Sequence, residues 1–342
     1  MKDHVLKLLV DVPVEPKALA ALRRSGRFDV DCMEPPEERV RDVDPSRLRG
    51  VDALFCTFPP SNLGDLDAVR WVQIASVGYA QLFGLDLAGR GIRATNARGC
   101  FDVPIGEWCV AMMVNLARDL RQMIRNQETA TWDRSAIFQR EVRGATVGLW
   151  GYGGIGRETA RLAKHMGMNV HVMTRSGAVE PRRDVFTVEG TGDPGGVLPD
   201  RIFGNGAEME FLGGLDFLVL AVPLTKTTEG MIGERELRAL PRSAYLLNPA
   251  RGPIVEQEAL LRALREGWIA GAALDAHYQY PTPPDHPTWA VPNVVFTPHI
   301  AGSTLSPRYR TRLWDVFAAN ADRFARGEPL LNELTPQQLA GA

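Results

Sequence analysis

The chain has 342 residues, of which 45% are hydrophobic and 23% charged, a composition typical of a globular protein with two domains. Its 39 basic and 41 acidic residues nearly cancel, to a net charge of −2. This balance excludes the strongly basic surface that binding to nucleic acid or an anionic membrane requires. No apolar stretch approaches the roughly 18 residues that span a bilayer, and the first ten residues, which carry Asp3, are unlike a signal peptide. We therefore expect a cytoplasmic protein with neither of these partners.

The cysteines predict no disulfide framework and no metal site. Cys32, Cys56, Cys100 and Cys109 have no C-x-x-C spacing and no histidine at ligand spacing. Buried free thiols are the simplest interpretation.

Short apolar runs alternate with helix-like segments over the first hundred residues. Helices are expected at Lys17–Arg24 and Leu66–Arg70, and strands at Leu6–Val10, Asp52–Cys56, Val72–Ala75 and Ile92–Thr95. Such alternation favours a parallel sheet with helices on its faces.

The next segment, Glu107–Ala117, is almost wholly apolar and continues as a more polar helix toward Gln127. A helix that is apolar all round is buried. It belongs either in a core or in a subunit interface.

A second alternating block starts at Ala145. Its expected strands are Thr146–Trp150, Val170–Met173, Phe217–Ala221, Ala244–Asn248, Gly271–Leu274 and Val294–Phe296. The chain then forms an amphipathic helix, Ser306–Arg326, which Gly327 ends.

One glycine-rich and proline-rich segment, between Arg175 and Asp216, cannot form a continuous helix. We expect a long loop there, which is either an insertion on the surface or a lid over a ligand.

The strongest local motif is a G-x-G-x-x-G pattern at residues 151–156, formed by Gly151, Gly153, Gly154, Ile155 and Gly156. It follows the strand that ends at Trp150 and opens a helix, which is the context of a dinucleotide fingerprint. The three glycines allow a tight turn, close approach of the pyrophosphate, and close packing of helix on strand. The helix amino terminus attracts the phosphates. The alternative is a glycine-rich turn without a ligand.

The end of the next strand carries Thr174, Arg175 and Ser176, where an NAD site usually places an acid. An arginine and two hydroxyls favour a 2′-phosphate, so we predict NADP in preference to NAD. In the alternative, Arg175 only stacks on the adenine and either cofactor binds. Arg182 and Arg183 would add to a phosphate site if the glycine-rich segment folded back.

Ordered motifs from Ile74 to Asn332 together resemble the D-isomer-specific 2-hydroxyacid dehydrogenases. The most specific are Leu247-Asn248-Pro249-Ala250-Arg251-Gly252, Asp285-His286-Pro287 and Thr297-Pro298-His299-Ile300-Ala301-Gly302, with Val222-Pro223-Leu224-Thr225 before them. The resemblance implies an α/β fold with two Rossmann-like domains, a flavodoxin-like substrate domain and a dinucleotide-binding domain, with parallel sheets and an interdomain cleft. The substrate domain would be residues 1–103 and 304–342, and the dinucleotide domain 104–303. The family is usually a homodimer held by the nucleotide domains, which the apolar helix after Glu107 fits.

The same resemblance implies an NAD(P)-dependent dehydrogenase that moves a hydride between nicotinamide and a small 2-oxo or D-2-hydroxy acid, such as glyoxylate or hydroxypyruvate. Arg251 matches the family's substrate-binding arginine, and His299 its acid–base histidine. The backbone N–H groups of Val77 and Gly78 correspond to the carboxylate cradle, and Asp275 to the residue that meets the nicotinamide carboxamide. Further cofactor contacts are expected at Pro223, Thr228, Ala250 and Gly302.

One departure from the family concerns the partner of the histidine. Tyr280 stands before Pro281, where the family usually has a glutamate. A phenol raises a histidine pKa less than a carboxylate does, so reduction should fade at lower pH than in relatives with glutamate. Arg98 also replaces a common proline.

Two alternatives stay open at this point. One is oxidation of another small anion, as formate or phosphite dehydrogenases perform it, since formate dehydrogenases also lack the glutamate. The other is a nucleotide-sensing protein like the corepressors built on this fold.

Overall fold

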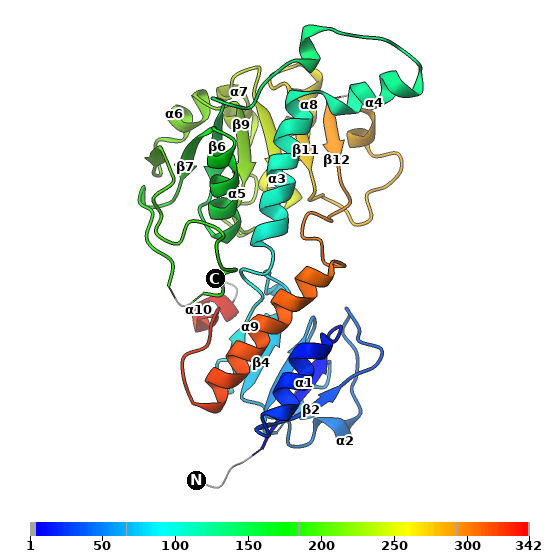
Figure 1. Cartoon of the computed structure of the whole chain (residues 1–342), viewed down its shortest axis with the longest axis vertical. Helices are drawn as coiled ribbons and strands as arrows, with labels where there is room; N and C mark the ends of the chain where they lie inside the picture. The colour runs from blue at the N-terminus through cyan, green and yellow to red at the C-terminus, as the bar shows by residue number, and fades with distance from the viewer. Residues whose placement is uncertain (1–4, 66, 184, 292, 341–342) are drawn as a thin grey trace. The chain divides into compact units, whose positions relative to one another are not determined.

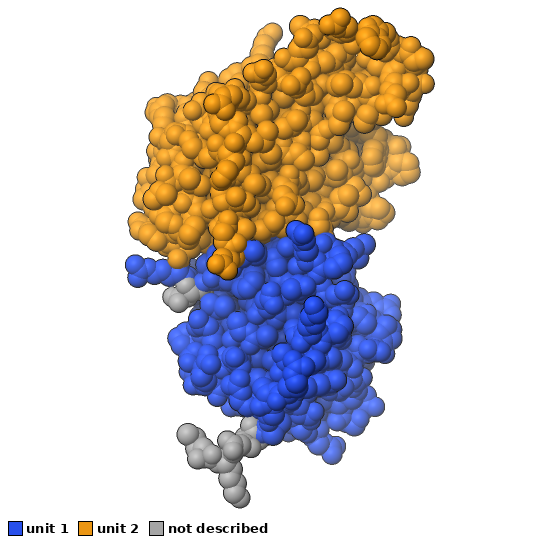
Figure 2. Space-filling view, viewed as in Figure 1, with its two compact units in different colours: residues 1–101, 183–188, 304–342 blue, residues 102–182, 189–303 orange. Residues whose placement is uncertain are grey.

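The structure is a computed structural model that describes residues 5–340, except 66, 184 and 292. It divides into two compact units, drawn in different colours in Figure 2. Unit 1 comprises Met1–Phe101, Arg183–Val188 and Thr304–Ala342, and unit 2 comprises Asp102–Arg182 and Glu189–Ser303. A short piece of the glycine-rich segment therefore belongs to unit 1, although its flanks belong to unit 2.

Unit 1 is built on a five-stranded parallel sheet with the order β2-β1-β3-β4-β5 (Figure 1). The strands are β1 (Leu6–Asp11), β2 (Phe28–Cys32), β3 (Ala53–Cys56), β4 (Trp71–Ile74) and β5 (Arg93–Thr95). The helices are α1 (Pro16–Arg24), α2 (Pro45–Leu48), α9 (Pro307–Ala325) and α10 (Pro336–Leu339). This strand order is that of flavodoxin-like folds.

Helix α9 brings the carboxyl-terminal part of the chain onto this sheet. Phe317 of α9 stacks on Phe55 at a ring-centroid distance of 4.2 Å and on Trp71 at 5.4 Å. All three side chains are fully buried. Burial of this aromatic area stabilises the packing of α9 on the sheet.

Unit 2 is built on a seven-stranded parallel sheet with the order β12-β11-β10-β9-β6-β7-β8. The strands are β6 (Thr146–Trp150), β7 (Asn169–Met173), β8 (Arg201–Phe203), β9 (Phe217–Leu220), β10 (Tyr245–Asn248), β11 (Gly271–Leu274) and β12 (Val294–Phe296). The order reverses at β6, as in the doubly wound dinucleotide-binding fold, so the α/β class and the two parallel sheets predicted from the sequence are confirmed.

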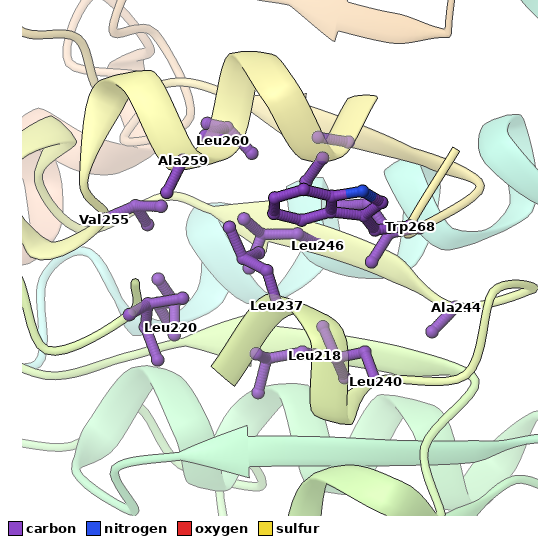
Figure 3. Packing of buried hydrophobic residues seen from close by; sticks show 14 of the residues in the cluster. Leu218, Leu220, Leu237, Leu240, Ala244, Leu246, Val255, Ala259, Leu260 and Trp268 are labelled. Carbon is purple, nitrogen blue, oxygen red and sulfur yellow. The ribbon is translucent and has the colours of Figure 1, made fainter. Parts of the chain in front are cut away.

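Helices cover both faces of this sheet (Figure 1). They are α3 (Asp102–Ala117), α5 (Gly154–His165), α6 (Glu208–Gly213), α7 (Glu234–Ala239) and α8 (Gln257–Arg265). Helix α4 (Leu120–Glu128) follows α3 and projects beyond the sheet (Figure 1). On the α7 and α8 face, Leu218 and Leu246 of the sheet pack with Leu237, Leu260 and Trp268 (Figure 3).

Helices α3 and α5 pack closely on the other face. A Cβ atom on Gly106 of α3 would lie 2.8 Å from Cγ of Glu158 in α5, so only glycine fits at this contact. The expectation for Glu107–Ala117 is confirmed in part, because the helix buries Cys109, Met113 and Leu116 but leaves its Val110 and Val114 side partly exposed.

Three expectations about elements were wrong or incomplete. The helix expected at Leu66–Arg70 is absent over 67–70, and Leu66 lies outside the described residues. A single turn lacks the length to offset helix nucleation, and the chain forms a 3-10 turn at Leu63–Asp65 instead. Strand β2 was missed, although its alternating Phe-Asp-Val-Asp pattern is a strand signal. The long loop between Arg175 and Asp216 contains strand β8 and helix α6.

Within the described part of the chain, no helix is both long enough and apolar enough to cross a bilayer.

Candidate active site

The predicted site residues of unit 2 gather at one edge of its sheet. Gly151 follows β6, Pro223 lies beyond β9, Ala250 follows β10, Asp275 follows β11, and His299 lies beyond β12. All these strands are parallel. Their carboxyl ends therefore share the edge where ligands of doubly wound sheets bind.

The fingerprint turn needs its glycines for two close approaches. Gly151 has φ +100°, and a Cβ there would lie 2.6 Å from the carbonyl oxygen of Ala221. A Cβ on Gly156 would overlap the carbonyl oxygen of Gly151. Turn, strand and helix are therefore in contact through backbone atoms alone.

The turn also fits the diphosphate of a dinucleotide. Gly153 is the N-cap of α5, and an added Cβ would meet nothing within 4 Å. Since the cap residue has no side chain, it leaves the amino end of α5 open to an anion. Gly154, Ile155 and Gly156 form the first turn of that helix.

The end of β7 carries hydroxyls and an arginine. The Thr174 hydroxyl donates to the Ala178 carbonyl at 3.1 Å, and the Ser176 hydroxyl accepts from the Ala178 N–H at 3.3 Å. The Arg175 side chain is exposed. No carboxylate stands at these three positions to oppose a 2′-phosphate.

The remaining predicted cofactor contacts lie in ordered turns. Thr228 donates through its hydroxyl to the Pro223 carbonyl at 2.7 Å and accepts from Thr225 N–H at 2.8 Å. The Ala250 N–H donates to the Asn248 side chain at 3.1 Å. Gly302 lies in the turn that follows His299.

Contacts with Asn248 and with the backbone of His277 fix the turn that carries Arg251. Asn248 also donates to the Arg251 carbonyl at 2.9 Å. A Cβ on Gly252 would lie 2.5 Å from the backbone of His277, so the two segments touch. The Arg251 side chain itself is exposed. Among the residues that the structure describes, it donates only to the Ala250 carbonyl, at 2.6 Å, so most of its donors face no described acceptor.

Asp275 holds the turn that carries His299. Its buried carboxylate accepts from the Thr297 hydroxyl at 2.6 Å, from the Ile300 N–H at 2.9 Å and from the Ala301 N–H at 3.0 Å. Within this turn His299 has φ +57°, a left-handed conformation that is uncommon outside glycine. Such strain persists only where the surroundings enforce it, and it is often found at functional sites.

Tyr280 contacts the imidazole directly. The distance from its hydroxyl to His299 Nδ1 is 2.9 Å, and the same oxygen accepts from the His277 N–H at 3.0 Å. The phenol therefore occupies the place of a carboxylate partner, but without its negative charge.

The surroundings of His299 disfavour the imidazolium. Loss of surrounding water lowers the pKa of His299, and the charges of Arg251 and His277 lower it further, while Asp275 opposes them. The net pKa lies below the usual 6.5. Arg251 and His299 are thus near enough to interact electrostatically.

In unit 1, Val77 and Gly78 follow β4 in an ordered turn. The Val77 carbonyl accepts from the Asn96 amide at 2.8 Å, and the Gly78 carbonyl accepts from the Ser76 hydroxyl at 2.7 Å. Their own N–H groups donate to no acceptor among the residues that the structure describes. Two adjacent backbone donors of this kind suit a carboxylate.

Sequence reasoning missed the part that Asp275 plays in holding the His299 turn, and it missed a buried network around Arg157. The Arg157 guanidinium donates to the carbonyls of Tyr152 and Asp193, and the Tyr152 hydroxyl donates to the Asp193 carboxylate at 2.7 Å. In the sequence, the one indication of this network is that Arg157 directly follows the fingerprint. Nothing in the sequence indicates that Asp193, 36 residues further along the chain, is its partner.

Together, the sheet edge, the fingerprint turn and the Arg251–His299 pair define a nicotinamide-dinucleotide-dependent oxidoreductase. The family model for "D-isomer specific 2-hydroxyacid dehydrogenase, NAD binding domain" matches residues 110–192 and 206–301. The chain belongs to this family. It is an NAD(P)-dependent dehydrogenase that transfers a hydride between nicotinamide and a small 2-oxo or 2-hydroxy acid.

Relatives and solved structures agree with this assignment. The glyoxylate reductase of Thermofilum pendens is 32% identical over 312 residues, 87% of each chain. That of Korarchaeum cryptofilum is 32% identical over 313 residues, 88% of each chain. The D-isomer specific 2-hydroxyacid dehydrogenase of Xanthobacter autotrophicus Py2, solved with NADPH and MES, is 26% identical with a TM-score of 0.74, over 98% of this chain and all of its own.

Two alanine substitutions in the fingerprint turn should have different effects, one on cofactor affinity and the other on stability. Gly153→Ala meets no atom and keeps an allowed φ of −75°, so the free energy of unfolding should change by less than about 0.5 kcal/mol. The added methyl group faces the phosphate position, so the dissociation constant for NADPH should rise at least about tenfold. Gly151→Ala combines a positive φ with a steric clash and should cost about 1–3 kcal/mol of stability.

Urea unfolding and calorimetric titration with NADPH measure both effects. Unchanged NADPH affinity in Gly153→Ala would contradict this placement of the cofactor.

Proposed function

We propose that the protein is an NADPH-preferring reductase of glyoxylate or hydroxypyruvate that forms the D-hydroxy acid where the product is chiral. The observation that carries the cofactor preference is the end of β7, where Thr174, Arg175 and Ser176 replace the acid expected for NAD. The substrate class is supported by relatives that are glyoxylate reductases. A small 2-oxo acid also suits a site with one exposed arginine.

In this proposal the site residues divide the work of binding and proton transfer. A nicotinamide held at this sheet edge would supply hydride chemistry. Arg251 forks onto the carboxylate and carbonyl oxygens. The N–H groups of Val77 and Gly78 are the other proposed carboxylate donors. His299 gives the proton to the carbonyl oxygen. Asp275, beyond its predicted contact with the carboxamide, keeps His299 in position through the 297–301 turn.

Tyr280 changes which tautomer of neutral His299 is favoured. A glutamate only accepts hydrogen bonds, so it holds the proton on Nδ1 and leaves Nε2 as a base. The Tyr280 hydroxyl accepts from the His277 N–H and still has its own proton to donate to Nδ1. That arrangement leaves the proton on Nε2 and depletes the base required for oxidation. The same Nδ1-protonated tautomer is what remains after His299 protonates the oxo acid, so this contact should weaken proton transfer in both directions.

The same contact supports a second candidate, oxidation of a small anion such as formate. That reaction moves a hydride without a proton transfer to oxygen, so it tolerates a histidine whose partner carries no charge. Tyr280 beside His299 is the observation in its favour.

A steady-state panel of substrates separates the two functions. We expect NADPH oxidation with glyoxylate and hydroxypyruvate, with kcat/KM for NADPH at least about tenfold above that for NADH, since a charge-assisted contact with the 2′-phosphate is worth more than 1 kcal/mol. Arg251→Lys should lower kcat/KM about a hundredfold and leave NADPH affinity unchanged. NADH preference refutes the cofactor proposal, and turnover with formate or phosphite alone refutes the substrate proposal.

The pH profile tests the Tyr280 contact. Reduction needs the imidazolium, so activity is present below the pKa of His299 and lost as the pH rises through it. Since that pKa is lowered, the decrease of kcat/KM with rising pH should begin at a pH lower than about 6.5. Tyr280→Glu places a carboxylate against Nδ1 and should move the fall about one pH unit higher or more. Tyr280→Phe is the uncharged control and should show no such rise. Identical profiles for wild type and Tyr280→Glu would exclude the idea.

We also propose a homodimer formed through unit 2. Exposed apolar side chains gather on α4 and the segment after it, which projects beyond the sheet of unit 2 (Figure 1); they are Leu120, Met123, Ile124, Trp132 and Ile137. Trp132 is 89% exposed. Monomeric proteins rarely leave such a group uncovered, and a second copy would bury it.

Sedimentation velocity tests the dimer. Wild type should sediment as a dimer, and Ile124→Glu/Trp132→Glu as a folded monomer, because two buried charges oppose association. Val40→Glu alters an exposed apolar residue of unit 1 and should remain dimeric. A wild-type monomer at micromolar concentration would overturn the proposal.

The proposed dehydrogenase function makes residues 1–103 and 304–342 the substrate domain and residues 104–303 the dinucleotide domain.

All four cysteines are free thiols, which suits the reducing conditions of the cytoplasm.

A further inference from the structure

The glycine-rich segment is packed onto α5 through buried Arg157. The Arg157 guanidinium donates to the Glu180 carbonyl at 2.5 Å and to the Asp193 carbonyl, and it lies 4.8 Å from the ring centroid of Tyr152. The neighbouring Glu158 accepts from the Gly192 N–H at 2.5 Å. Residues on both sides of the segment are therefore tied to the same turn of the helix.

The tie includes the fingerprint itself. Tyr152, its second residue, donates its hydroxyl proton to Asp193, whose carboxylate also accepts from the N–H groups of Val197 and Leu198 at 3.0 Å each. Burial alone would raise the pKa of Asp193, but these hydrogen bonds and the Arg157 charge lower it. The segment is thus built against the dinucleotide turn, and residues 193–205 fall between the two stretches that match the family model.

This packing brings Arg182 to the start of α5. Its N–H donates to the Pro194 carbonyl at 3.0 Å, and its guanidinium pairs with the Asp102 carboxylate at 3.2 Å. That carboxylate fills the space where a side chain on Gly154 would lie, so a Cβ there would overlap it. Gly154 is the first residue of α5, where the diphosphate is expected.

A carboxylate at this place raises an electrostatic problem for the cofactor. The amino end of a helix favours a negative charge, but Asp102 and a diphosphate would repel each other there. Arg182 neutralises Asp102. Its side chain is only 13% exposed, yet among the described residues its guanidinium makes this one hydrogen bond out of five possible donors. The other donors are left for an anion beside the same helix turn.

We propose that Arg182 is a ligand of the dinucleotide diphosphate, delivered to α5 by the glycine-rich segment and oriented by Asp102. The inference rests on the dinucleotide site of the proposed function and adds a cation to it from outside the fingerprint. Asp102 and the Tyr152–Asp193–Arg157 network act as positioning groups.

Calorimetric titration of the full chain with NADPH and with NADH tests the inference without turnover. Arg182→Gln should weaken both cofactors by the same factor, about ten- to a hundredfold, because both carry the diphosphate. Arg182→Lys should keep most of the affinity. Arg242→Gln removes the same charge from an exposed side chain that precedes β10, and should bind like wild type.

A double-mutant cycle tests the link to Asp102. Arg182→Gln removes a cation that offsets the Asp102 charge near the diphosphate, so Asp102→Asn/Arg182→Gln should bind NADPH more tightly than Arg182→Gln. Equal affinities would overturn the screening role. Melting temperatures close to wild type show that each variant is folded, and Arg182→Met, which keeps the apolar stem but not the charge, carries the test if the glutamine variant does not fold.

Three results would overturn the diphosphate assignment. The first is unchanged affinity for both cofactors in Arg182→Gln. The second is a loss of affinity for NADPH alone, which would move Arg182 to the 2′-phosphate. The third is an equal loss of affinity in Arg242→Gln. Failure of the proposed reductase activity looks different, since cofactor would bind normally without turnover of oxo acids.

Discussion

The carboxylate of Asp275 is the group on which the candidate active site depends. It lies at the end of β11 and binds three donors of the 297–301 turn beyond β12. These bonds hold the backbone of His299 in a left-handed conformation. That conformation costs free energy, and without the bonds the turn would relax to a more favourable one. With His299 fixed, Tyr280 reaches its Nδ1 atom, and the ring lies within electrostatic range of Arg251. The acid–base group is thus oriented by a residue on the neighbouring strand.

The parallel sheet of unit 2 supplies the rest of the arrangement. Because its strands all point the same way, the turns after β6, β10, β11 and β12 meet at one edge. Residues 148 positions apart, Gly151 and His299, therefore belong to one site. The glycine-rich segment adds a layer to this edge. It binds the fingerprint through Tyr152 and Arg157, and it brings the Arg182–Asp102 ion pair to the start of α5.

The sequence was informative wherever the signal is local. The apolar strands of unit 2, the fingerprint and the motifs around Arg251 and His299 all follow from short patterns, and the structure places them at one sheet edge. Contacts between distant residues had no such signal. Nothing near Asp102 indicates that its carboxylate covers Gly154, or that Arg182 would pair with it 80 residues later. Strand β8 and helix α6 were not predicted, because the glycines around them indicate a loop. Their apolar residues are Ile202, Phe203, Phe211 and Leu212.

The central claim is that Arg251 and His299 act together on a bound 2-oxo acid beside the nicotinamide. The most direct measurement is a crystal structure of the protein with NADP⁺ and oxamate, an unreactive analogue of a 2-oxo acid. The account predicts His299 Nε2 and the Arg251 guanidinium both about 3 Å from oxamate oxygens, next to C4 of the nicotinamide. A structure in which the two side chains enter separate cavities, or in which side chains fill the nicotinamide position, would contradict it.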